Sequence, residues 1–477
     1  MNQINVFITT LFVRMPIIKQ VIDAVIAEGG RALLVGGAVR DILLNRVPKD
    51  IDIELYGLKI DEIQRILEKF GNVSMVGKSF GVFRLNGLDV DWSAPRRDSN
   101  GRKPQVELDP DMLFEDAFRR RDLTINAMGV DLQTGKLVDH FGGLQDLKDE
   151  KLCATDAKLF VEDSLRFFRV MQIVGRFEME ADAQLNKICK KMDLSTISRE
   201  RIESEFNKLF LRSQRPSLGI DWLRKIGRLK EILPEVDMLC GVQQGKKWHP
   251  EGDVYIHTLQ VIDAMAAINR SKFAHLNDQE KLMLMWAALC HDLGKPFTSK
   301  EWEPGKISAH GHENAGIEPT KKLLKRFTHD KDLIDRVVKL VQYHMQPGQF
   351  IENEAKGSAY KRLAAKLVPV TLEELTLLAC ADKLARNADS TNPLAVTNGF
   401  LDLEEAKEVC KNEFNFMQTA SKLNVLRDVE APVLLGRDLE GLVAPGPKMG
   451  RLLKKAYEIQ IEEGKKNKDE LKKRILT

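Results

Sequence analysis

LVGGAVRDILLNRVPKDIDIE, residues Leu34–Glu54, decides the fold of the first part of this 477-residue chain. The pattern predicts a buried strand, a turn at Gly36 and Gly37, a short helix, and a second strand that holds Asp50 and Asp52. Because alternate side chains of a strand point to one face, we expect the two carboxylates side by side. Adjacent carboxylates repel each other unless cations lie between them, which predicts a pair of Mg²⁺ ions.

The two glycines add a second element of chemistry to the same stretch. A Gly-Gly turn lets the backbone approach a ligand closely, and the N-terminus of the following helix favours anions. Either feature alone is commonplace, since most such turns are only turns and most Asp-x-Asp pairs are solvated. Their order and short separation predict a phosphate cradle beside a two-metal site, as phosphoryl or nucleotidyl transfer requires.

Composition sets limits on the rest of the chain. At this length two to four domains are expected, and 30% charged residues with 6% aromatics are typical of a helix-rich protein. The net charge of only +3 means that nucleic-acid binding depends on local basic patches. Six scattered cysteines without CxxC spacing indicate a reducing cytoplasm, and no segment is long enough to span a membrane.

The opening stretch resembles the GGxVRD and DxD signature of the class II tRNA nucleotidyltransferase and poly(A) polymerase family. The resemblance implies an α+β fold, with a small polymerase-beta-like mixed sheet and helices at the N-terminus, followed by an all-α neck, body, HD domain and C-terminal helical domain. It implies catalytic roles for Asp50 and Asp52 and a third metal-supporting acid at Asp91, although Asp89 shares the face of Asp91. Gly36, Gly37 and Arg40 are then implied nucleotide-binding residues.

Residues 116–128, DAFRRRDLTINAM, resemble the RRDFTINAM motif of that family, with Leu123 in place of Phe. An Arg-Arg-Arg run taken alone is usually surface charge, but apolar residues follow it at once. By the resemblance, Arg121 and Asp122 contact the triphosphate and ribose of the incoming nucleotide, and Asn126 lies near the sugar.

Residues 161–170, VEDSLRFFRV, match the EDxxR element of the family. We expect Asp163 and Arg166 on one helical face, three residues apart. A carboxylate accepts from the amine of cytosine or adenine, and a guanidinium donates to the neighbouring ring acceptor. Uracil and guanine present a carbonyl oxygen to the carboxylate, at a cost of roughly 1–3 kcal/mol for each hydrogen bond that cannot form. Such a pair selects CTP and ATP without a nucleic-acid template, although an Asp–Arg pair is also a common surface salt bridge.

A second chemistry begins after residue 241, where eight of the nine histidines of the chain lie. Imidazole and carboxylate ligands suit a divalent transition metal that activates water against phosphoesters. The set resembles the HD superfamily of metal-dependent phosphohydrolases and implies a metal such as Ni²⁺ or Mn²⁺ at His257, His291, Asp292 and Asp382. His312 and His344 are implied as ligands of a second metal or as phosphate-binding groups.

The order of these parts resembles that of CCA-adding enzymes that carry an HD domain. We therefore expect an N-terminal extension and helix, a nucleotidyltransferase head, a base-selecting neck, a body, an HD domain and a C-terminal tRNA-binding domain, at residues 1–28, 29–158, 159–213, 214–240, 241–392 and 393–477. In the last of these, a basic helical face beside a PGPxxG turn is an expected site of binding to the phosphate backbone: Lys448, Arg451, Lys454 and Lys455.

The resulting prediction is an enzyme that adds or repairs the 3′-terminal CCA of tRNA from CTP and ATP, releasing pyrophosphate, with an additional HD phosphohydrolase activity. The sequence leaves three alternatives open: a split-activity enzyme that adds only CC or only A, a poly(A) polymerase, and a non-catalytic RNA-binding protein. The polar loop 96–104 weighs against CC addition alone, because relatives that add the terminal A carry a flexible loop there. The oligomeric state, monomer or homodimer, also stays open.

Overall fold

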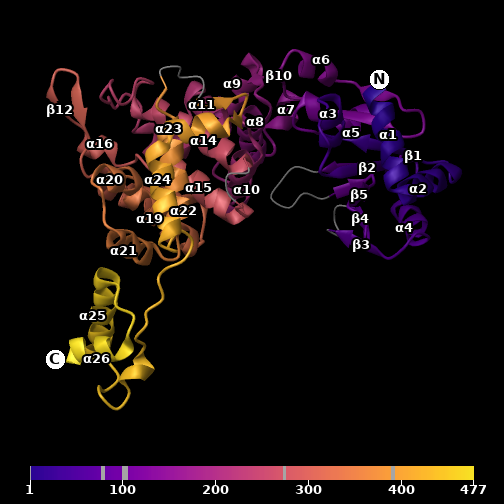
Figure 1. The fold of residues 1–477 in the computed structure, drawn as a ribbon. Coiled ribbons are helices and arrows are strands. Elements are labelled where there is room, and N and C mark those ends of the chain that lie inside the picture. The colour runs from indigo at the N-terminus through magenta and orange to yellow at the C-terminus, as the bar shows by residue number, and fades with distance from the viewer. Residues whose placement is uncertain (1, 77–80, 99–105, 272–274, 388–392, 477) are drawn as a thin grey trace. The chain divides into compact units, whose positions relative to one another are not determined.

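The computed structural model groups the chain into two compact units, residues 1–198 and 199–477 (Figure 1). The boundary between them falls inside the segment expected as the neck, 159–213. The residues that the structure describes are 2–76, 81–98, 106–271, 275–387 and 393–476. The loop expected at 96–104 lies mostly outside them.

The N-terminal unit is built on a mixed sheet of seven strands in the order β3-β4-β5-β2-β1-β8-β9. Strands β2 and β5 are parallel, and the other neighbours in this sheet are antiparallel. The α+β fold with a mixed N-terminal sheet, expected from the resemblance, is thus confirmed. The strands are β1 (Arg31–Val35), β2 (Ile51–Tyr56), β3 (Val73–Val76), β4 (Val82–Leu85), β5 (Val90–Ser93), β8 (Met128–Asp131) and β9 (Leu137–Asp139).

Helices and short strands surround this sheet. The N-terminal extension is helical, and Ile4, Ile8 and Leu11 of its first helix are buried. One cluster of the core joins Leu33 and Phe118 with residues of three strands. The helices are α1 (Asn2–Arg14), α2 (Pro16–Ala27), α3 (Gly37–Leu43), α4 (Ile60–Glu68), α5 (Phe114–Arg119), α6 (Gly143–Lys148), α7 (Ala157–Phe160), α8 (Leu165–Phe177) and α9 (Ala183–Lys191); the short pairs are β6 (Arg96–Asp98) with β7 (Val106–Leu108), and β10 (Lys151–Leu152) with β11 (Glu180–Ala181).

The C-terminal unit is almost entirely helical, as expected. Its core includes packed rings of Phe206, Phe210, Trp286 and Phe327. The helices up to the end of the HD region are α10 (Arg199–Arg212), α11 (Pro216–Lys225), α12 (Leu229–Ile232), α13 (Pro234–Asp237), α14 (Val254–Arg270), α15 (Asp278–Cys290), α16 (Lys295–Thr298), α17 (His312–Ala315), α18 (Ile317–Phe327), α19 (Lys331–Tyr343), α20 (Gln346–Glu352), α21 (Gly357–Leu367) and α22 (Leu372–Leu384). Two hairpins, which the sequence did not predict, are β12 (Lys300–Glu303) with β13 (Lys306–Ser308) and β14 (Val396–Thr397) with β15 (Phe400–Leu401).

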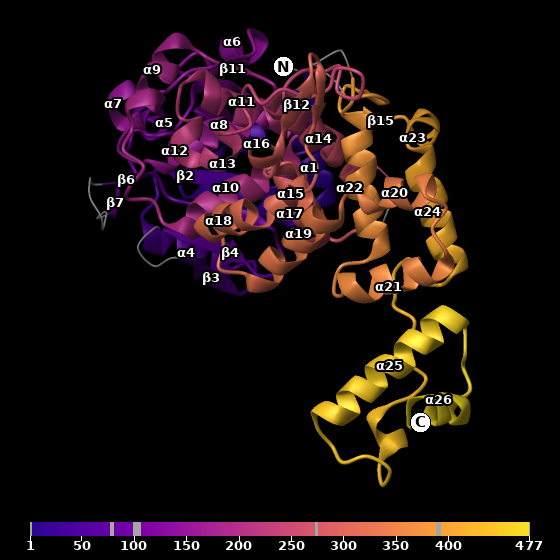
Figure 2. The same cartoon turned by 90° about the vertical axis from the view of Figure 1, so that its left-hand side faces the viewer.

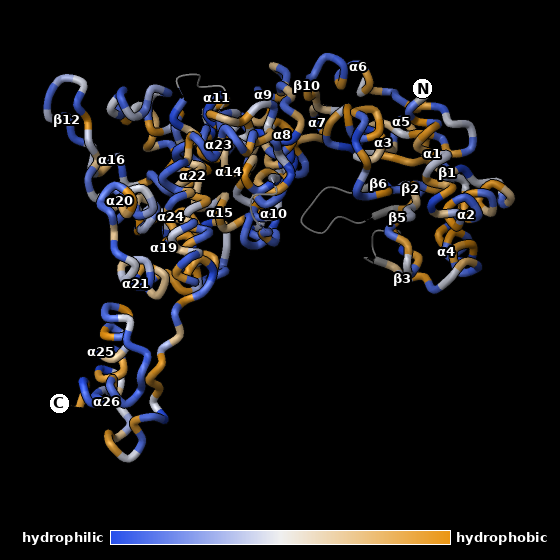
Figure 3. Tube along the Cα trace, in the orientation of Figure 1, coloured by the Kyte–Doolittle hydropathy of each residue, from blue (hydrophilic) through white to orange (hydrophobic). Residues whose placement is uncertain are grey.

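The remaining helices are α23 (Leu403–Val409), α24 (Lys411–Lys422), α25 (Pro447–Glu463) and α26 (Lys468–Leu476). The ring of Phe416 in α24 stacks on Tyr360 of α21, so a helix of the segment expected as the C-terminal domain, 393–477, packs with the HD helices. Helices α25 and α26 pair around a small apolar cluster of their own (Figure 2). Hydrophobic residues alternate with hydrophilic ones along the helices (Figure 3), and no helix among the described residues is long and apolar enough to cross a membrane.

Candidate functional site

The first group of functional residues lies where β2 and β5 run side by side. Asp52 is the register partner of Asp91, so both side chains leave the same face of the sheet. Asp89 precedes β5. Asp50 also lies outside a strand, one residue before β2, which corrects the expectation that one strand holds both Asp50 and Asp52.

Negative charge accumulates around Asp52. Burial raises the pKa of Asp52 above its ordinary value, and the nearby carboxylates of Asp91 and Asp50 raise it further, against the opposing charge of Arg121. Asp91 itself forms an ion pair with Arg84 of β4, with Nη2 of the arginine 3.1 Å from Oδ2. Oxygen ligands crowded in this way fit a hard divalent cation such as Mg²⁺.

The glycine turn carries an arginine directly above it. Gly36 has φ +70° and precedes α3, and a Cβ placed on it would lie 2.6 Å from Nη1 of Arg121. Only glycine leaves room for that guanidinium and adopts this backbone conformation without strain. The structure therefore places Arg121 against the turn that the sequence predicted as a phosphate cradle.

Arg40, Asp122 and Asn126 form one buried hydrogen-bond network. Asn126 donates to Oδ1 of Asp122 at 3.0 Å and accepts from Nη1 of Arg40 at 2.5 Å. Burial disfavours ionisation of Asp122, but Arg169 and these N–H donors outweigh it and lower the pKa to about 2. Arg40 also lies over the ring of Phe177, 4.4 Å from its centroid. All three predicted nucleotide-binding residues are thus held rigidly below the surface.

Asp163 and Arg166 are close in the structure. The prediction that both lie on one helix is wrong, however, because only Arg166 belongs to α8. Helix α8 begins at Leu165, and Asp163 precedes it with Oδ1 accepting from the Leu165 N–H at 3.1 Å. Short acidic side chains favour this role because free N–H groups at a helix start need acceptors. Arg166 donates to the carbonyl oxygens of Leu159 at 2.9 Å and Arg120 at 2.5 Å.

In the C-terminal unit, three histidines share one geometry that prepares them for a metal. Nδ1 of His291, His312 and His344 lies 2.9, 2.8 and 2.7 Å from the carbonyl oxygen three residues earlier. A carbonyl oxygen only accepts, so Nδ1 carries the proton and Nε2 of the neutral ring keeps its lone pair. Nε2 of His312 lies 3.1 Å from Nε2 of His344. Lone pairs facing each other at this distance repel unless a cation lies between them.

Asp292 connects two groups of ligand atoms within this site. Its Oδ2 is 3.2 Å from Nε2 of His291, and its Oδ1 is 3.3 Å from Nε2 of His312. Nε2 of His257 lies 3.0 Å from Oδ1 of Asp382 and 3.4 Å from Nε2 of His291. Among the described residues, all groups of three ligand atoms within 4.8 Å of one another belong to this site. The six residues predicted from the sequence are thus brought together, with Asp292 between two halves.

Charged residues that the sequence analysis did not assign surround these ligands. Lys295 lies 2.7 Å from Asp292, and Arg386 lies 2.9 Å from Asp382. Glu251 is fully buried and lies 2.7 Å from Nδ1 of His257. Burial opposes ionisation of Asp292 and Asp382, but the cationic neighbours hold both pKa values well below the ordinary range. Lys295 comes three residues after Asp292 in the sequence. This spacing could have identified Lys295 from the sequence as the cation that pairs with Asp292.

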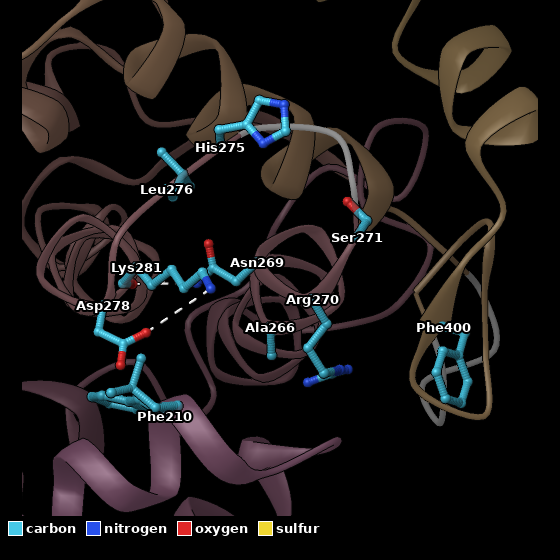
Figure 4. A pocket seen from close by; sticks show the side chains of 11 residues that line it. Phe210, Ala266, Asn269, Arg270, Ser271, His275, Leu276, Asp278, Lys281 and Phe400 are labelled. Carbon is cyan, nitrogen blue, oxygen red and sulfur yellow. Dashed lines mark hydrogen bonds and ion pairs between the residues drawn. The ribbon is translucent and has the colours of Figure 1, made fainter.

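One further histidine lies beside the predicted metal ligands: the ring centroids of His249 and His257 are 4.7 Å apart, and Nδ1 of His249 lies 2.9 Å from Oε1 of Glu251. Two other histidines belong to none of the ligand groups among the described residues. His310 is exposed, and His329 contacts Arg199. A pocket of about 530 Å³ opens between α14 and the β14–β15 hairpin (Figure 4). Its lining includes Arg270, whose guanidinium donates to backbone oxygens of Ser213 and Gln214 and so serves packing. The four predicted RNA-binding cations of α25 lie on a largely solvent-accessible face: Lys448, Arg451, Lys454 and Lys455.

Comparison with known proteins identifies the family. The chain is 32% identical over 366 residues to the multifunctional CCA protein of Pasteurella multocida, covering 74% of this chain and 83% of that one. The chain belongs to the multifunctional CCA protein family. Another multifunctional CCA protein, from Methylobacillus flagellatus, is 31% identical to this chain over 406 residues. The match covers 77% of this chain and 94% of that protein.

Family models match three parts of the chain, and solved structures share its fold. Residues 32–153 match the Poly A polymerase head domain, 178–240 the "Probable RNA and SrmB-binding site of polymerase A", and 254–387 the HD domain. The fold is similar to that of the Bacillus stearothermophilus CCA-adding enzyme in complex with CTP, with a TM-score of 0.64, 18% identity, and coverage of 95% of this chain and 96% of that one. The Thermotoga maritima CCA-adding enzyme in complex with tRNA gives a TM-score of 0.57 at 16% identity, with 98% of both chains covered.

Proposed function

We propose that this chain adds or repairs the 3′-terminal CCA of tRNA, using CTP and ATP and releasing pyrophosphate. The observation that carries the proposal is the register pairing of Asp52 with Asp91 beside the Gly36 turn, in a chain of the multifunctional CCA family. This arrangement joins a cation-binding carboxylate group to a cradle for anionic phosphates.

Asp50 and Asp52 would hold Mg²⁺, supported by Asp91. The bound ions would lower the pKa of the tRNA 3′-hydroxyl and stabilise the charge of the leaving pyrophosphate. Arg121, over the glycine turn, is suited to the triphosphate because its guanidinium forks toward anionic oxygens. Asp122 and Asn126 are rigid through their shared hydrogen bond, which suits the positioning of a ribose.

Asp163 and Arg166 would select the base, as the EDxxR resemblance implies. The helix-start position of Asp163 supports this role in a different way from a shared helical face. One carboxylate oxygen is anchored by the backbone of Leu165, which restricts the orientation of the whole side chain. An acceptor with a fixed orientation discriminates an amine from a carbonyl better than a mobile one.

The experiment is incorporation of labelled CTP and ATP, separately and together, into tRNA transcripts that end before CCA, after C and after CC. Ordered addition that stops at CCA is expected, and the D50A/D52A variant should add nothing. Addition of only CC or only A would establish a split-activity enzyme. A long A tail would establish a poly(A) polymerase, and no incorporation by the wild-type chain would favour a non-catalytic RNA-binding protein.

We propose a second activity for the HD domain, because the Nε2 atoms of its histidines converge around Asp292. His257, His291, Asp292 and Asp382 would hold one divalent transition metal, and His312 and His344 a second one that shares Asp292. Metal bound there would activate water against a phosphoester. Lys295 and Arg386 add positive charge that suits a phosphate substrate.

This hydrolase would remove phosphate or cyclic phosphate from tRNA 3′-ends and so restore the hydroxyl that the head requires. Hydrolysis of RNA ending in a 2′,3′-cyclic phosphate, with Mn²⁺ or Ni²⁺ added to metal-free protein, tests the proposal. The H291A variant should lose this hydrolysis while nucleotide addition persists. Full hydrolysis by H291A would contradict the assignment of the site.

A further inference from the structure

We propose that Glu54 is a positioning residue that holds the guanidinium of Arg121 at the glycine turn and away from Asp52. Glu54 lies on β2, two residues beyond Asp52, so its side chain leaves the same face of the sheet. The pattern thus presents three acidic side chains in succession, Asp50, Asp52 and Glu54. The inference rests on the proposed nucleotidyl transfer and assigns the third of them a role distinct from metal binding.

The contacts of Glu54 separate it from the two aspartates. Its side chain is only 4% exposed, whereas Asp50 is exposed and Asp52 half-buried. Oε1 accepts from Nη2 of Arg121 at 2.9 Å and, at the longer distance of 3.3 Å, from Nη2 of Arg120. Oε2 accepts from the hydroxyl of Tyr56 at 2.8 Å. Both carboxylate oxygens are therefore occupied by protein donors. A carboxylate held in this way is poorly suited to recruit a metal ion and well suited to orient an arginine.

Tyr56 makes the anchor rigid. Its ring packs edge-on against Phe114 at 4.7 Å and belongs to the apolar cluster that also contains Leu33. Burial and the neighbouring Glu54 carboxylate raise the pKa of Tyr56 above its ordinary value, so the phenol stays protonated and keeps donating. Glu54 is thus fixed by the core on one side and holds Arg121 on the other.

Arg121 has a strong alternative partner. Its charge already acts on Asp52, which has no hydrogen-bonded cation of its own among the described contacts. A flexible guanidinium released from Glu54 would be drawn to that carboxylate, because charge-assisted pairs are the strongest hydrogen bonds that a side chain forms. Arg121 would then occupy the position needed by a cation and leave the turn. The Nε–H of Arg121 is buried without a protein acceptor among the described residues.

The E54Q variant tests this role, because glutamine keeps the size of the side chain and removes its charge. KM for CTP and for ATP should rise roughly 10-fold, as expected when a charge-assisted hydrogen bond is removed, and more Mg²⁺ should be needed for half-maximal rate. Binding of CTP in Ca²⁺, measured by calorimetry without tRNA, should weaken by a similar factor. E68Q, on the surface of α4, is the matched control and should change neither value.

A double-mutant cycle with R121A distinguishes an effect through Arg121 from a general structural defect. In the R121A background, E54Q should raise KM no further, and melting temperatures should show that every variant is folded. An unchanged or lowered KM for E54Q, or an equal loss with and without Arg121, would overturn the inference. Absence of nucleotide addition by the wild-type chain would instead overturn the proposed function, so the two failures are distinguishable.

Discussion

Replacing Asp292 by asparagine should destabilise the metal-free HD region and remove its ability to bind two metal ions. Asp292 is 1% exposed and its Oδ2 lies 2.7 Å from Nζ of Lys295. Lys295 is itself buried, with the oxygen of Gln244 2.6 Å away as its other partner. D292N keeps the shape of the site and leaves this ammonium group buried without its counter-charge.

The cost of breaking a buried ion pair from one side is about 3–5 kcal/mol. For a unit of this size, each kcal/mol lowers the melting temperature by roughly 2 °C, so a decrease of about 6–10 °C is expected. Calorimetric melting in excess chelator measures this value without any contribution from bound metal. The D292N/K295M double variant should recover at least half of the loss, because it removes the unpaired charge.

Two results would refute this reasoning. If D292N lowers the free energy of unfolding in chelator by less than about 1 kcal/mol, the Asp292–Lys295 pair contributes as little to stability as a surface ion pair. A full complement of two Mn²⁺ or Ni²⁺ ions per D292N chain, measured by equilibrium dialysis, would show that this carboxylate does not connect the two halves of the site.

Three further predictions concern other parts of the chain. The G36A variant should weaken CTP binding at least 10-fold, because the added Cβ meets Arg121 at 2.6 Å; G87A, which also has positive φ but open space around it, should cost only about 1 kcal/mol of stability and leave CTP binding intact. Burial raises the pKa of Asp263 to about 6 in the folded state, above its value in the unfolded chain, so protonation of this carboxyl favours folding. As the pH rises from about 4 to about 7, the free energy of unfolding of the wild type should therefore fall by about 3 kcal/mol relative to that of D263N, as measured by urea unfolding. Parallel pH profiles of the two proteins would contradict this prediction. Alanine substitution of all four predicted RNA-binding cations of α25, Lys448, Arg451, Lys454 and Lys455, should make tRNA binding less dependent on salt. The magnitude of the slope of log K against log[salt] should decrease by about one for each phosphate that is no longer neutralised. An unchanged slope would exclude this helix face as an RNA-binding surface.

Local patterns predicted the parts of each site that lie within one stretch of chain. The Gly36 turn and the acidic strand of Asp52 follow from adjacent residues, and histidine enrichment after residue 241 indicated a metal site. Composition indicated a helix-rich chain, and the resemblance to the family placed the all-α part after the N-terminal sheet. Resemblance to known families supplied the assignment of Asp91 and the six HD ligands, because nothing local marks which distant acids converge.

What sequence reasoning missed depends on three-dimensional packing. Glu54 was assigned no role from the sequence, since its partners Tyr56 and Arg121 come together only when β2 meets the segment after α5. Asp163 was placed inside a helix because its spacing from Arg166 suits one, whereas its side chain is a better helix-start acceptor. The two hairpins escaped notice because their strands are only two to four residues long.

The parallel pairing of β2 with β5 has a consequence for the order in which the protein acquires activity. The strands that carry Asp52 and Asp91 are separated along the chain by α4, β3 and β4. A nascent chain that ends before β5 holds Asp50 and Asp52 but lacks Asp91, and closing so non-local a contact is slow. Nucleotide binding would therefore arise only after the sheet has closed across this crossover, which keeps incompletely folded chains from trapping CTP or ATP.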